Sequence, residues 1–259
     1  MFYEKATRYK GGLNMENTLL IFDFDDTIIA TNMEFEKTNE LVANKLSTLL
    51  YGNTEKVSEI LMMQRQFDIE LIKTYGFARP RYLLSWNKTY EYFCEQTNHD
   101  IDLEVVKEVE LLVNDVYERR FENIPDSIPV LKELRDAGYR MVILTAGEDE
   151  IQRKRVKESG ALDFVDDVYV YIVKTPTTLK EVMDKNPAQH YVMIGNSLKS
   201  DIHPALENDV WAFHFERETW EADQFDIDFA HPKYVHIPKL TEIPKKLRKV
   251  LGQAESTIV

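Results

Sequence analysis

The sequence predicts an α/β protein, in which a doubly wound parallel sheet carries an inserted all-helical cap domain. Short apolar runs alternate with helical patterns over most of the chain, which is typical of parallel strands joined by right-handed crossover helices. The stretch from about 31 to 124 instead shows helical periodicity without a further buried strand. These two observations predict a core formed by 18–30 and 125–259, a helical cap at 31–124 and a leader at 1–17.

Five apolar runs are expected to form strands, and one more strand is expected near the end of the chain. Thr18 to Phe24 is almost continuously apolar, as in a strand that is buried on both faces of a parallel sheet. A last strand and helix are expected within 237–253, before a frayed tail. The other runs lie at 139–145, 167–173, 190–195 and 210–215.

Helical patterns fill the segments between these runs. In the core they predict helices within 127–138, 148–160 and 175–186, of which the first two close on glycine and the third has Pro176 at its start. The helices expected in the cap lie at 33–51, 54–75, 82–97 and 102–120.

Composition excludes several classes of protein. A formal net charge of −13 disfavours a long anionic partner such as a nucleic acid polymer. No segment approaches the roughly 20 uninterrupted apolar residues of a membrane span, and the N-terminus lacks the apolar stretch of a signal peptide. The single cysteine, Cys94, excludes an internal disulfide and agrees with a reducing compartment. We therefore expect a cytoplasmic protein without a membrane partner, in which Cys94 packs within a helix.

Polar residues of unusual type follow four of the expected strands. Ligands bind at the carboxyl ends of the strands in open α/β sheets, so residues there are informative about function. Asp23 and Asp25 follow the first strand and share one face of it, because side chains alternate along a strand. Two carboxylates this close repel each other unless a cation lies between them. The later strand ends carry Thr145-Ala146-Gly147, Lys174 and the sequence GNSLKSD at 195–201.

Taken singly, the later motifs have ordinary structural explanations. Thr145 alone would be a cap or turn residue, and Lys174 alone a solvated surface lysine. The paired aspartates are the exception, and their juxtaposition indicates a functional site. We assign no metal to the histidines at 190, 203, 214, 231 and 236, which lie on different expected elements without ligand spacing.

In this order, at four successive strand ends, the motifs resemble those of the haloacid dehalogenase-like hydrolase superfamily, from Thr18 to about Leu247. DFDDT at 23–27 matches the superfamily's DxDxT motif in full, and Thr145 and Lys174 fall where its second and third motifs belong. The insert between the first and second motifs is similar to the helical-cap subclass. The resemblance therefore implies a Rossmann-like core with a helical cap.

Residues around these motifs resemble one subgroup of small-molecule phosphatases, which includes some nucleotidases. The similar segments are KTPTT at 174–178, GNSLKSD at 195–201 and FERETWEAD at 215–223. Glu216, Trp220 and Glu221 match this downstream pattern, with a lid or interface role and a structural role as open alternatives. Within DFDDT, Asp26 is expected to cap a helix and Thr27 to form a hydrogen bond within the turn.

The resemblance implies a mechanism. Asp23 would be the nucleophile that attacks phosphorus, and Asp25 would protonate the leaving oxygen and later deprotonate the attacking water. Lys174 would neutralise charge on Asp23 and on the phosphoryl group. The residues implied to bind the phosphoryl group are Thr145, Ala146, Gly147 and Lys174.

The resemblance also implies Mg²⁺ as the cofactor, because this ion prefers oxygen ligands and offsets the negative charge of the substrate. The implied ligands are Asp23, the backbone carbonyl of Asp25, Asn196 and Asp201. Many relatives have aspartate where this chain has Asn196, so an amide oxygen would replace a carboxylate. We interpret Asn196 as a variant that the subgroup tolerates, because the other three motifs are intact.

The cap carries the expected specificity residues. The segment 75–86 breaks helical periodicity and contains Arg79 and Arg81, which we expect to contact the substrate from a loop between cap helices. An interhelical turn with solvated arginines is an equally weighted alternative. Aromatic residues in this segment could stack on a ligand, although packing between helices is the favoured interpretation. They are Tyr75, Phe77, Tyr82 and Trp86.

The leading hypothesis is a Mg²⁺-dependent phosphatase that acts on a small phosphorylated metabolite, with nucleotides and sugar phosphates as candidates. A phosphomutase resembles the same arrangement, and a catalytically silent protein that binds a phosphorylated ligand is a further alternative. Haloacid dehalogenase activity is disfavoured, because those relatives lack the second aspartate that Asp25 supplies and their chemistry needs no metal.

Overall fold

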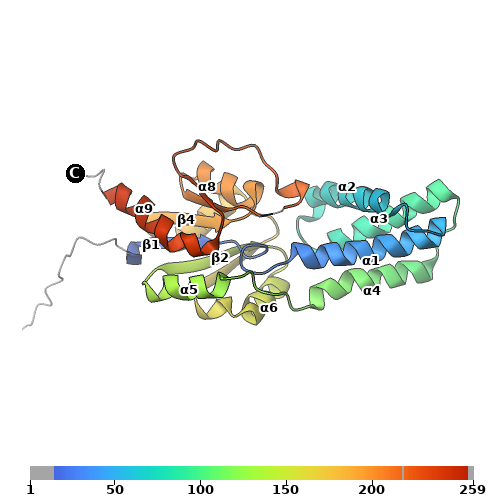
Figure 1. Ribbon diagram of the computed structural model, residues 1–259, viewed down its shortest axis with the longest axis horizontal. Helices are drawn as coiled ribbons and strands as arrows, with labels where there is room; N and C mark the ends of the chain where they lie inside the picture. The colour runs from blue at the N-terminus through green and yellow to red at the C-terminus, as the bar shows by residue number, and fades with distance from the viewer. Residues whose placement is uncertain (1–14, 218, 256–259) are drawn as a thin grey trace, which may run out of the picture.

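A computed structural model describes residues 15–217 and 219–255 and contains one six-stranded parallel sheet (Figure 1). The strand order is β3-β2-β1-β4-β5-β6, which confirms the predicted doubly wound fold. The strands are β1 Thr18–Phe22, β2 Arg140–Ala146, β3 Asp167–Tyr171, β4 His190–Gly195, β5 Trp211–Phe215 and β6 Tyr234–Ile237. Most of the expected leader, apart from a short turn at Met15–Asn17, lies outside the described residues, as does the tail at 256–259.

The central strand, β1, explains the first apolar run of the sequence. All five of its residues are buried, because β2 and β4 flank it and helices cover both of its faces. Phe22 pairs with Ile143 of β2 and with Ile194 of β4. The residue after β1, Asp23, therefore emerges at the point where the strand order reverses, which is the ligand-binding position of open α/β sheets.

Five core helices cover the two faces of the sheet. They are α5 Ser127–Asp136, α6 Asp149–Ser159, α7 Pro176–Lys185, α8 His203–Glu207 and α9 Ile243–Glu255. Leu20 and Phe22 of β1 belong to one hydrophobic cluster with α5, α6 and α9. Leu19 and Ile21 belong to a second cluster with α7 and α8. This division follows from the alternation of side chains along the strand.

The prediction of a last strand within 237–253 was wrong in its position. Strand β6 ends at Ile237, where the predicted segment begins, and it pairs with β5 over Ala212–Phe215. The apolar pattern of this strand is weak because it lies at the edge of the sheet, where only Ile237 of its four residues is buried. The predicted terminal helix is present as α9.

Four helices form the helical insert between β1 and α5, and Figure 1 shows them grouped beyond the end of the sheet. They are α1 Asn32–Tyr51, α2 Val57–Tyr75, α3 Arg79–Thr97 and α4 Leu103–Glu118. Helix α3 begins at Arg79 and not at 82, so the predicted loop is shorter and both Arg79 and Arg81 lie in the first turn of a helix. The reason is Pro80, which interrupts a helix interior but is well accommodated in a first turn.

The connection between α2 and α3 is attached to the sheet. Gly76 has a φ of +57°, and a Cβ atom there would lie 2.2 Å from Cγ2 of Ile172, just after β3. The N–H of Phe77 donates to the carbonyl of Ile172 at 3.0 Å, and the N–H of Arg79 donates to Oε1 of Glu148 at 2.6 Å. The insert is thus fixed to the loops that follow β2 and β3, and only glycine fits the closest approach.

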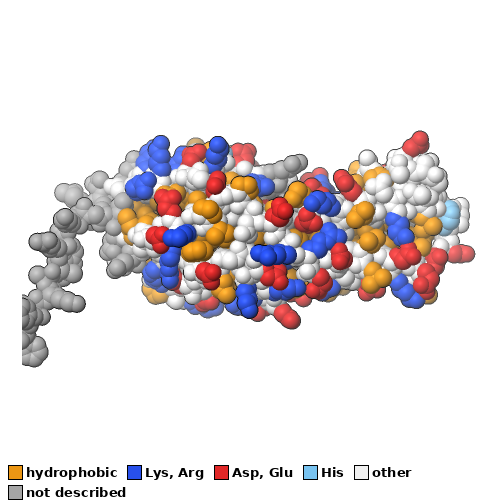
Figure 2. Space-filling model, turned by 60° about the horizontal axis from the view of Figure 1, so that its bottom comes forward, with side chains coloured by type: hydrophobic (Ala, Val, Ile, Leu, Met, Phe, Trp, Pro, Cys, Tyr) orange, Lys and Arg blue, Asp and Glu red, His pale blue; other side chains and the backbone are white. Residues whose placement is uncertain are grey.

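Three further observations concern the surface, the cysteine and the membrane prediction. Figure 2 shows basic and acidic side chains interspersed over one face, from the sheet to the helical insert. Cys94 is buried in α3, which confirms its expected packing position. None of the helices in the described part of the chain is long and apolar enough to cross a membrane.

We expect Trp86→Ala to lower the free energy of unfolding by about 3–5 kcal/mol, because Trp86 is fully buried in the helical insert and its loss would leave a large cavity. Its indole N–H also donates to Oδ1 of Asn39 at 3.3 Å. The control is Leu111→Ala on α4, where a 72% exposed side chain should change stability by less than about 0.5 kcal/mol. Denaturant unfolding followed by circular dichroism measures both, and equal effects would contradict this assignment of the core.

Candidate active site

The loop after β1 holds Asp23 in a fixed position. The N–H of Asp23 donates to the carbonyl of Ile194 at 2.8 Å, which extends the hydrogen bonding of the sheet by one residue. The hydroxyl of Thr27 donates to Oδ2 of Asp23 at 2.7 Å, as predicted for this turn. Asp23 is only 3% exposed, and it lines the cavity described below.

Asp26 caps helix α1. Its backbone has a φ of +56°, a conformation that aspartate tolerates better than most residues. Its carboxylate accepts hydrogen bonds from the N–H groups of Thr31 at 3.0 Å and Asn32 at 3.1 Å. The predicted capping role is confirmed, and it ties the start of the helical insert to the loop that carries Asp23.

Lys174 joins residues from three strand ends. Its Nζ lies 2.5 Å from Oδ1 of Asp23 and 2.5 Å from Oδ1 of Asp201, and all three side chains are buried. Burial alone would lower the pKa of Lys174, but the carboxylates of Asp201 and Asp23 outweigh burial and raise it. The ammonium group therefore stays charged and offsets the repulsion between the two acids.

The second carboxylate oxygen of Asp201 is also hydrogen-bonded. Oδ2 accepts a hydrogen bond from the N–H of Ser197 at 3.0 Å, and a Cβ atom on Gly195 would lie 2.3 Å from it. Burial and repulsion from Asp23 raise the pKa of Asp201 to about 7, although Lys174 opposes this effect. In this geometry Asp201 positions Lys174, and a direct bond from Asp201 to a metal stays a prediction.

Asp25 faces a different set of partners from Asp23. Its Oδ2 accepts hydrogen bonds from Nε2 of Gln152 at 2.5 Å and from the hydroxyl of Thr145 at 3.3 Å. Its Oδ1 has no hydrogen-bond partner and lies 3.9 Å from Nη1 of Arg155. Burial raises the pKa of Asp25, with Arg155 opposing, and a raised pKa suits a carboxyl group that donates a proton.

The predicted phosphoryl-binding residues of β2 are close to Asp25 but already hydrogen-bonded. Thr145 is fully buried, and its hydroxyl also accepts from Nε2 of Gln152 at 2.7 Å. The N–H of Gly147 donates to the carbonyl of Tyr171 at 2.8 Å, so it belongs to the sheet. Ala146 and Gly147 line the cavity described below. Contact between Thr145 and a substrate would require the present hydrogen bonds to change.

Asn196 faces the two oxygens that the metal prediction requires. One end of its amide lies 3.2 Å from Oδ2 of Asp23 and 3.3 Å from the backbone carbonyl of Asp25. With Oδ1 at this end, three oxygens converge, which is unfavourable unless a cation lies among them. With Nδ2 at this end, the amide donates to both oxygens. The residues therefore fit Mg²⁺, whose binding would select the first orientation.

A metal site built from charged side chains alone is not present in the described residues, where no group of three or more His, Cys, Asp or Glu side chains is arranged to hold an ion. The predicted site differs in kind, because an amide oxygen and a backbone carbonyl supply two of its ligands. Oxygen ligands of this kind are ordinary for Mg²⁺, which keeps several water ligands as well.

Sequence reasoning missed three side chains of the site. Gln152 and Arg155 lie one turn apart on α6 and are buried, although that helix is mostly charged and nothing in the sequence separates Arg155 from its exposed neighbours. The guanidinium of Arg155 lies over the ring of Phe121, with a distance of 4.3 Å to the ring centroid. Asp223, in the segment already singled out for Trp220, faces the site, and burial raises its pKa.

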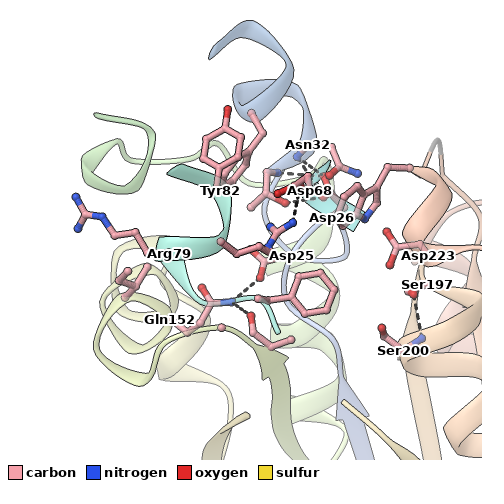
Figure 3. Close-up of a pocket in the computed structure, with 18 of the residues that line it drawn as sticks. Asp25, Asp26, Asn32, Asp68, Arg79, Tyr82, Gln152, Ser197, Ser200 and Asp223 are labelled. Carbon is pink, nitrogen blue, oxygen red and sulfur yellow. Dashed lines mark hydrogen bonds and ion pairs between the residues drawn. The ribbon is translucent and has the colours of Figure 1, made fainter. Parts of the chain in front are cut away.

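One cavity joins these residues to the helical insert (Figure 3). Its core side carries Asp23, Asp25, Lys174, Asn196, Asp201 and Asp223. Its insert side carries Phe35, Gln64, Asp68, Phe77, Arg79, Arg81, Tyr82 and Tyr117, and Trp220 completes it from the segment after β5. The cavity therefore combines an acidic end, where the paired aspartates lie, with an aromatic and charged end.

The two predicted specificity arginines differ in their position. Arg79 lines the cavity, but Figure 3 shows its side chain directed away from Asp25, and its Nε donates to Oδ1 of Asn114 at 2.8 Å. Arg81 is buried and forms an ion pair with Asp68. The alternative of solvated arginines is therefore wrong for Arg81.

The remaining predicted residues, in the cap and after β5, also differ in whether they are buried, line the cavity or lie on the surface. Tyr82 and Trp86 are buried among the helices of the insert, as the packing interpretation predicted, although Tyr82 also lines the cavity. Trp220 contacts the ring of Phe77, with 6.2 Å between centroids. Glu216 is exposed and pairs with His236 at 2.8 Å, which gives it a surface role.

Comparisons with known proteins agree with this geometry. A family model for haloacid dehalogenase-like hydrolases matches residues 18–208. A haloacid dehalogenase-like family hydrolase from Xanthomonas campestris has a TM-score of 0.75 at 21% identity, with 93% of this chain and 99% of that chain covered. A search of curated proteins finds no significant match.

Other similar structures differ in the activity that their descriptions name. A HAD phosphatase from Thermococcus onnurineus has a TM-score of 0.57 at 24% identity, covering 91% of this chain and 98% of its own. The HAD-hydrolase YfnB from Bacillus subtilis, described as bound to magnesium, has a TM-score of 0.58 at 18% identity, with 91% and 99% covered. Haloacid dehalogenases are similar as well. These likenesses establish the fold, and the family model spans most of the sequence: the chain belongs to the haloacid dehalogenase-like hydrolase family.

Proposed function

We propose that the protein is a Mg²⁺-dependent phosphatase that hydrolyses a small phosphomonoester through an aspartyl-phosphate on Asp23. The observation that carries this proposal is the pair of aspartates at the end of β1 with different surroundings. Asp23 forms an ion pair with Lys174, whereas burial raises the pKa of Asp25. A carboxylate paired with a cation suits nucleophilic attack, and a carboxyl group with a raised pKa suits proton donation.

The first step transfers the phosphoryl group to Asp23. A carboxylate oxygen of Asp23 forms a bond to phosphorus, the ester P–O bond breaks, and the proton of Asp25 passes to the leaving oxygen. Lys174 and Arg155 lie beside the two aspartates and stabilise negative charge that spreads over the phosphoryl oxygens.

The second step restores the enzyme. Asp25, now ionised, accepts a proton from a water molecule that attacks phosphorus, and the bond between phosphorus and Asp23 breaks. Free phosphate and the Asp23 carboxylate result. The ordered position of Asp25, held by Gln152 and Thr145, serves both proton transfers.

Asp23, the carbonyl of Asp25 and Asn196 would hold the Mg²⁺ ion, with Asp201 as the fourth predicted ligand. When bound, the ion supplies positive charge that offsets the repulsion between the acidic site and the phosphoryl group. The magnesium described for the similar YfnB structure supports this cofactor. Phosphatase activity itself is supported by the likeness to the Thermococcus onnurineus protein.

Dehalogenase activity is the competing reaction, since dehalogenases share the fold. That reaction has no use for a second carboxyl group that protonates a leaving oxygen, and here Asp25 lines the same cavity as Asp23. A phosphomutase would use the same two aspartates, but it would return the phosphoryl group to its substrate, so release of free phosphate distinguishes the two activities.

We expect Asp23→Asn to abolish phosphate release from p-nitrophenyl phosphate, because the amide cannot act as the nucleophile. Asp25→Asn should reduce kcat by about 10²–10⁴-fold, the usual contribution of a general acid and base. Release by the unaltered protein should require Mg²⁺. Measurement of free phosphate with and without the ion decides this, and equal activity of Asp23→Asn and the unaltered protein would overturn the proposal.

Asn196→Asp should lower the Mg²⁺ concentration that gives half-maximal activity by about tenfold, which corresponds to about 1.4 kcal/mol of binding free energy. The added carboxylate would face the oxygens of Asp23 and Asp25 and would attract a cation between them. A titration of activity against Mg²⁺ measures the shift. An unchanged titration would show that Asn196 is not a ligand.

A further inference from the structure

The ion pair of Asp68 and Arg81 lies in the wall of the cavity, on the side of the helical insert. Asp68 belongs to α2 and Arg81 to the first turn of α3, and their exposed fractions are 6% and 7%. Nη1 of Arg81 donates to Oδ2 of Asp68, both residues line the cavity, and Figure 3 shows Asp68 above Asp25. Oδ1 of Asp68 and Nε of Arg81 have no hydrogen-bond partner.

Stability alone does not explain this pair. Removing two charges from water is costly, and apolar residues of similar volume are often at least as stabilising. A buried oxygen and a buried N–H without partners add to that cost, and such groups are rare in folded proteins. Burial also raises the pKa of Asp68, against the attraction of Arg81. The pair is therefore better explained by a ligand that supplies the missing hydrogen bonds.

Aromatic rings from two elements hold the guanidinium of Arg81 in place. The guanidinium of Arg81 lies over the rings of Phe77 and Trp220, at 5.4 and 5.5 Å from their centroids. Phe77 is fixed to the loop after β3, and Trp220 belongs to the core segment after β5. The pair is thus preorganised at a fixed place relative to Asp23 and Asp25.

We propose that Asp68 and Arg81 recognise the leaving group of the substrate, and that this leaving group carries a hydroxyl or amino group. A hydroxyl fits both atoms, because it can donate to Oδ1 of Asp68 and accept from Nε of Arg81. A second anionic group on the substrate is disfavoured, because Asp68 already neutralises Arg81. The substrate class is a phosphate ester of a polyol or an amino alcohol. This inference rests on the proposed phosphatase function.

The test compares substrates with and without the donor group. The probes are glycerol 3-phosphate, ribose 5-phosphate and ethanolamine phosphate, which carry hydroxyl or amino groups, and p-nitrophenyl phosphate, whose leaving group has none. The measured quantity is the ratio of kcat/KM for the best of the first three probes to kcat/KM for p-nitrophenyl phosphate. Asp68→Asn should lower this ratio by about 10- to 100-fold, because a charge-assisted hydrogen bond is lost. The preferred probe shows whether the donor is a hydroxyl or an amine.

Two further variants separate recognition from folding. Asp115→Asn, which breaks an exposed ion pair with Arg119 on α4, is the matched control and should leave the ratio unchanged. Asp68→Leu/Arg81→Met removes both charges together and leaves neither buried charge unpaired, so it tests recognition independently of the stability of Asp68→Asn. It should lose the preference for hydroxyl or amino substrates.

The outcomes are distinct. Three results would overturn the inference while the phosphatase function stands. The double variant could retain the preference, Asp68→Asn could lose activity equally on all substrates, or the unaltered protein could favour p-nitrophenyl phosphate over all three probes. Absence of phosphate release from every probe by the unaltered protein would overturn the phosphatase function, and with it the inference.

Discussion

The contact of Lys174 with Asp23 and Asp201 is the interaction on which the site depends. Asp23, Lys174 and Asp201 follow β1, β3 and β4, and their buried charges are stable only together. The parallel order β3-β2-β1-β4 brings these strand ends to one edge, and Gly195 leaves the space that Asp201 occupies. One ammonium group thus pairs with two buried carboxylates. The remaining negative charge explains why a cation fits beside Asn196.

The helical insert completes the site because it is held at several places. Asp26 caps α1 from the loop that carries Asp23, and the N–H of Phe77 donates to Ile172 in the loop after β3, two residues before Lys174. The proposed catalytic residues and the proposed leaving-group contacts therefore share one frame, which is the condition for orienting a bound ester. In the proposed function, the sheet edge handles the phosphoryl group and the insert contacts the rest of the substrate.

Much of the fold and part of the candidate site could be predicted from the sequence, because these features depend on residues that are adjacent in the chain. A strand buried on both faces must be continuously apolar, so the apolar run that begins at Thr18 identified β1, which ends at Phe22, just before Asp23. Asp25 lies beyond this strand, so strand alternation does not account for its position. Gln152, Arg155 and Asp68 could not be found in this way. Each lies on a helix whose polar residues are mostly exposed, and its burial depends on an element distant in the sequence. Asn196 was found, but its two possible orientations became visible only with the facing oxygens in place.

The most direct test of the account is to identify the covalent intermediate. The protein would be quenched with acid during turnover of p-nitrophenyl phosphate in ¹⁸O-labelled water with Mg²⁺, and its peptides analysed by mass spectrometry. The account predicts a phosphoryl group on Asp23, with solvent ¹⁸O in the released phosphate and none in the Asp23 carboxylate, because water attacks phosphorus. Phosphate release without modification of Asp23, or ¹⁸O in the Asp23 carboxylate, would contradict it.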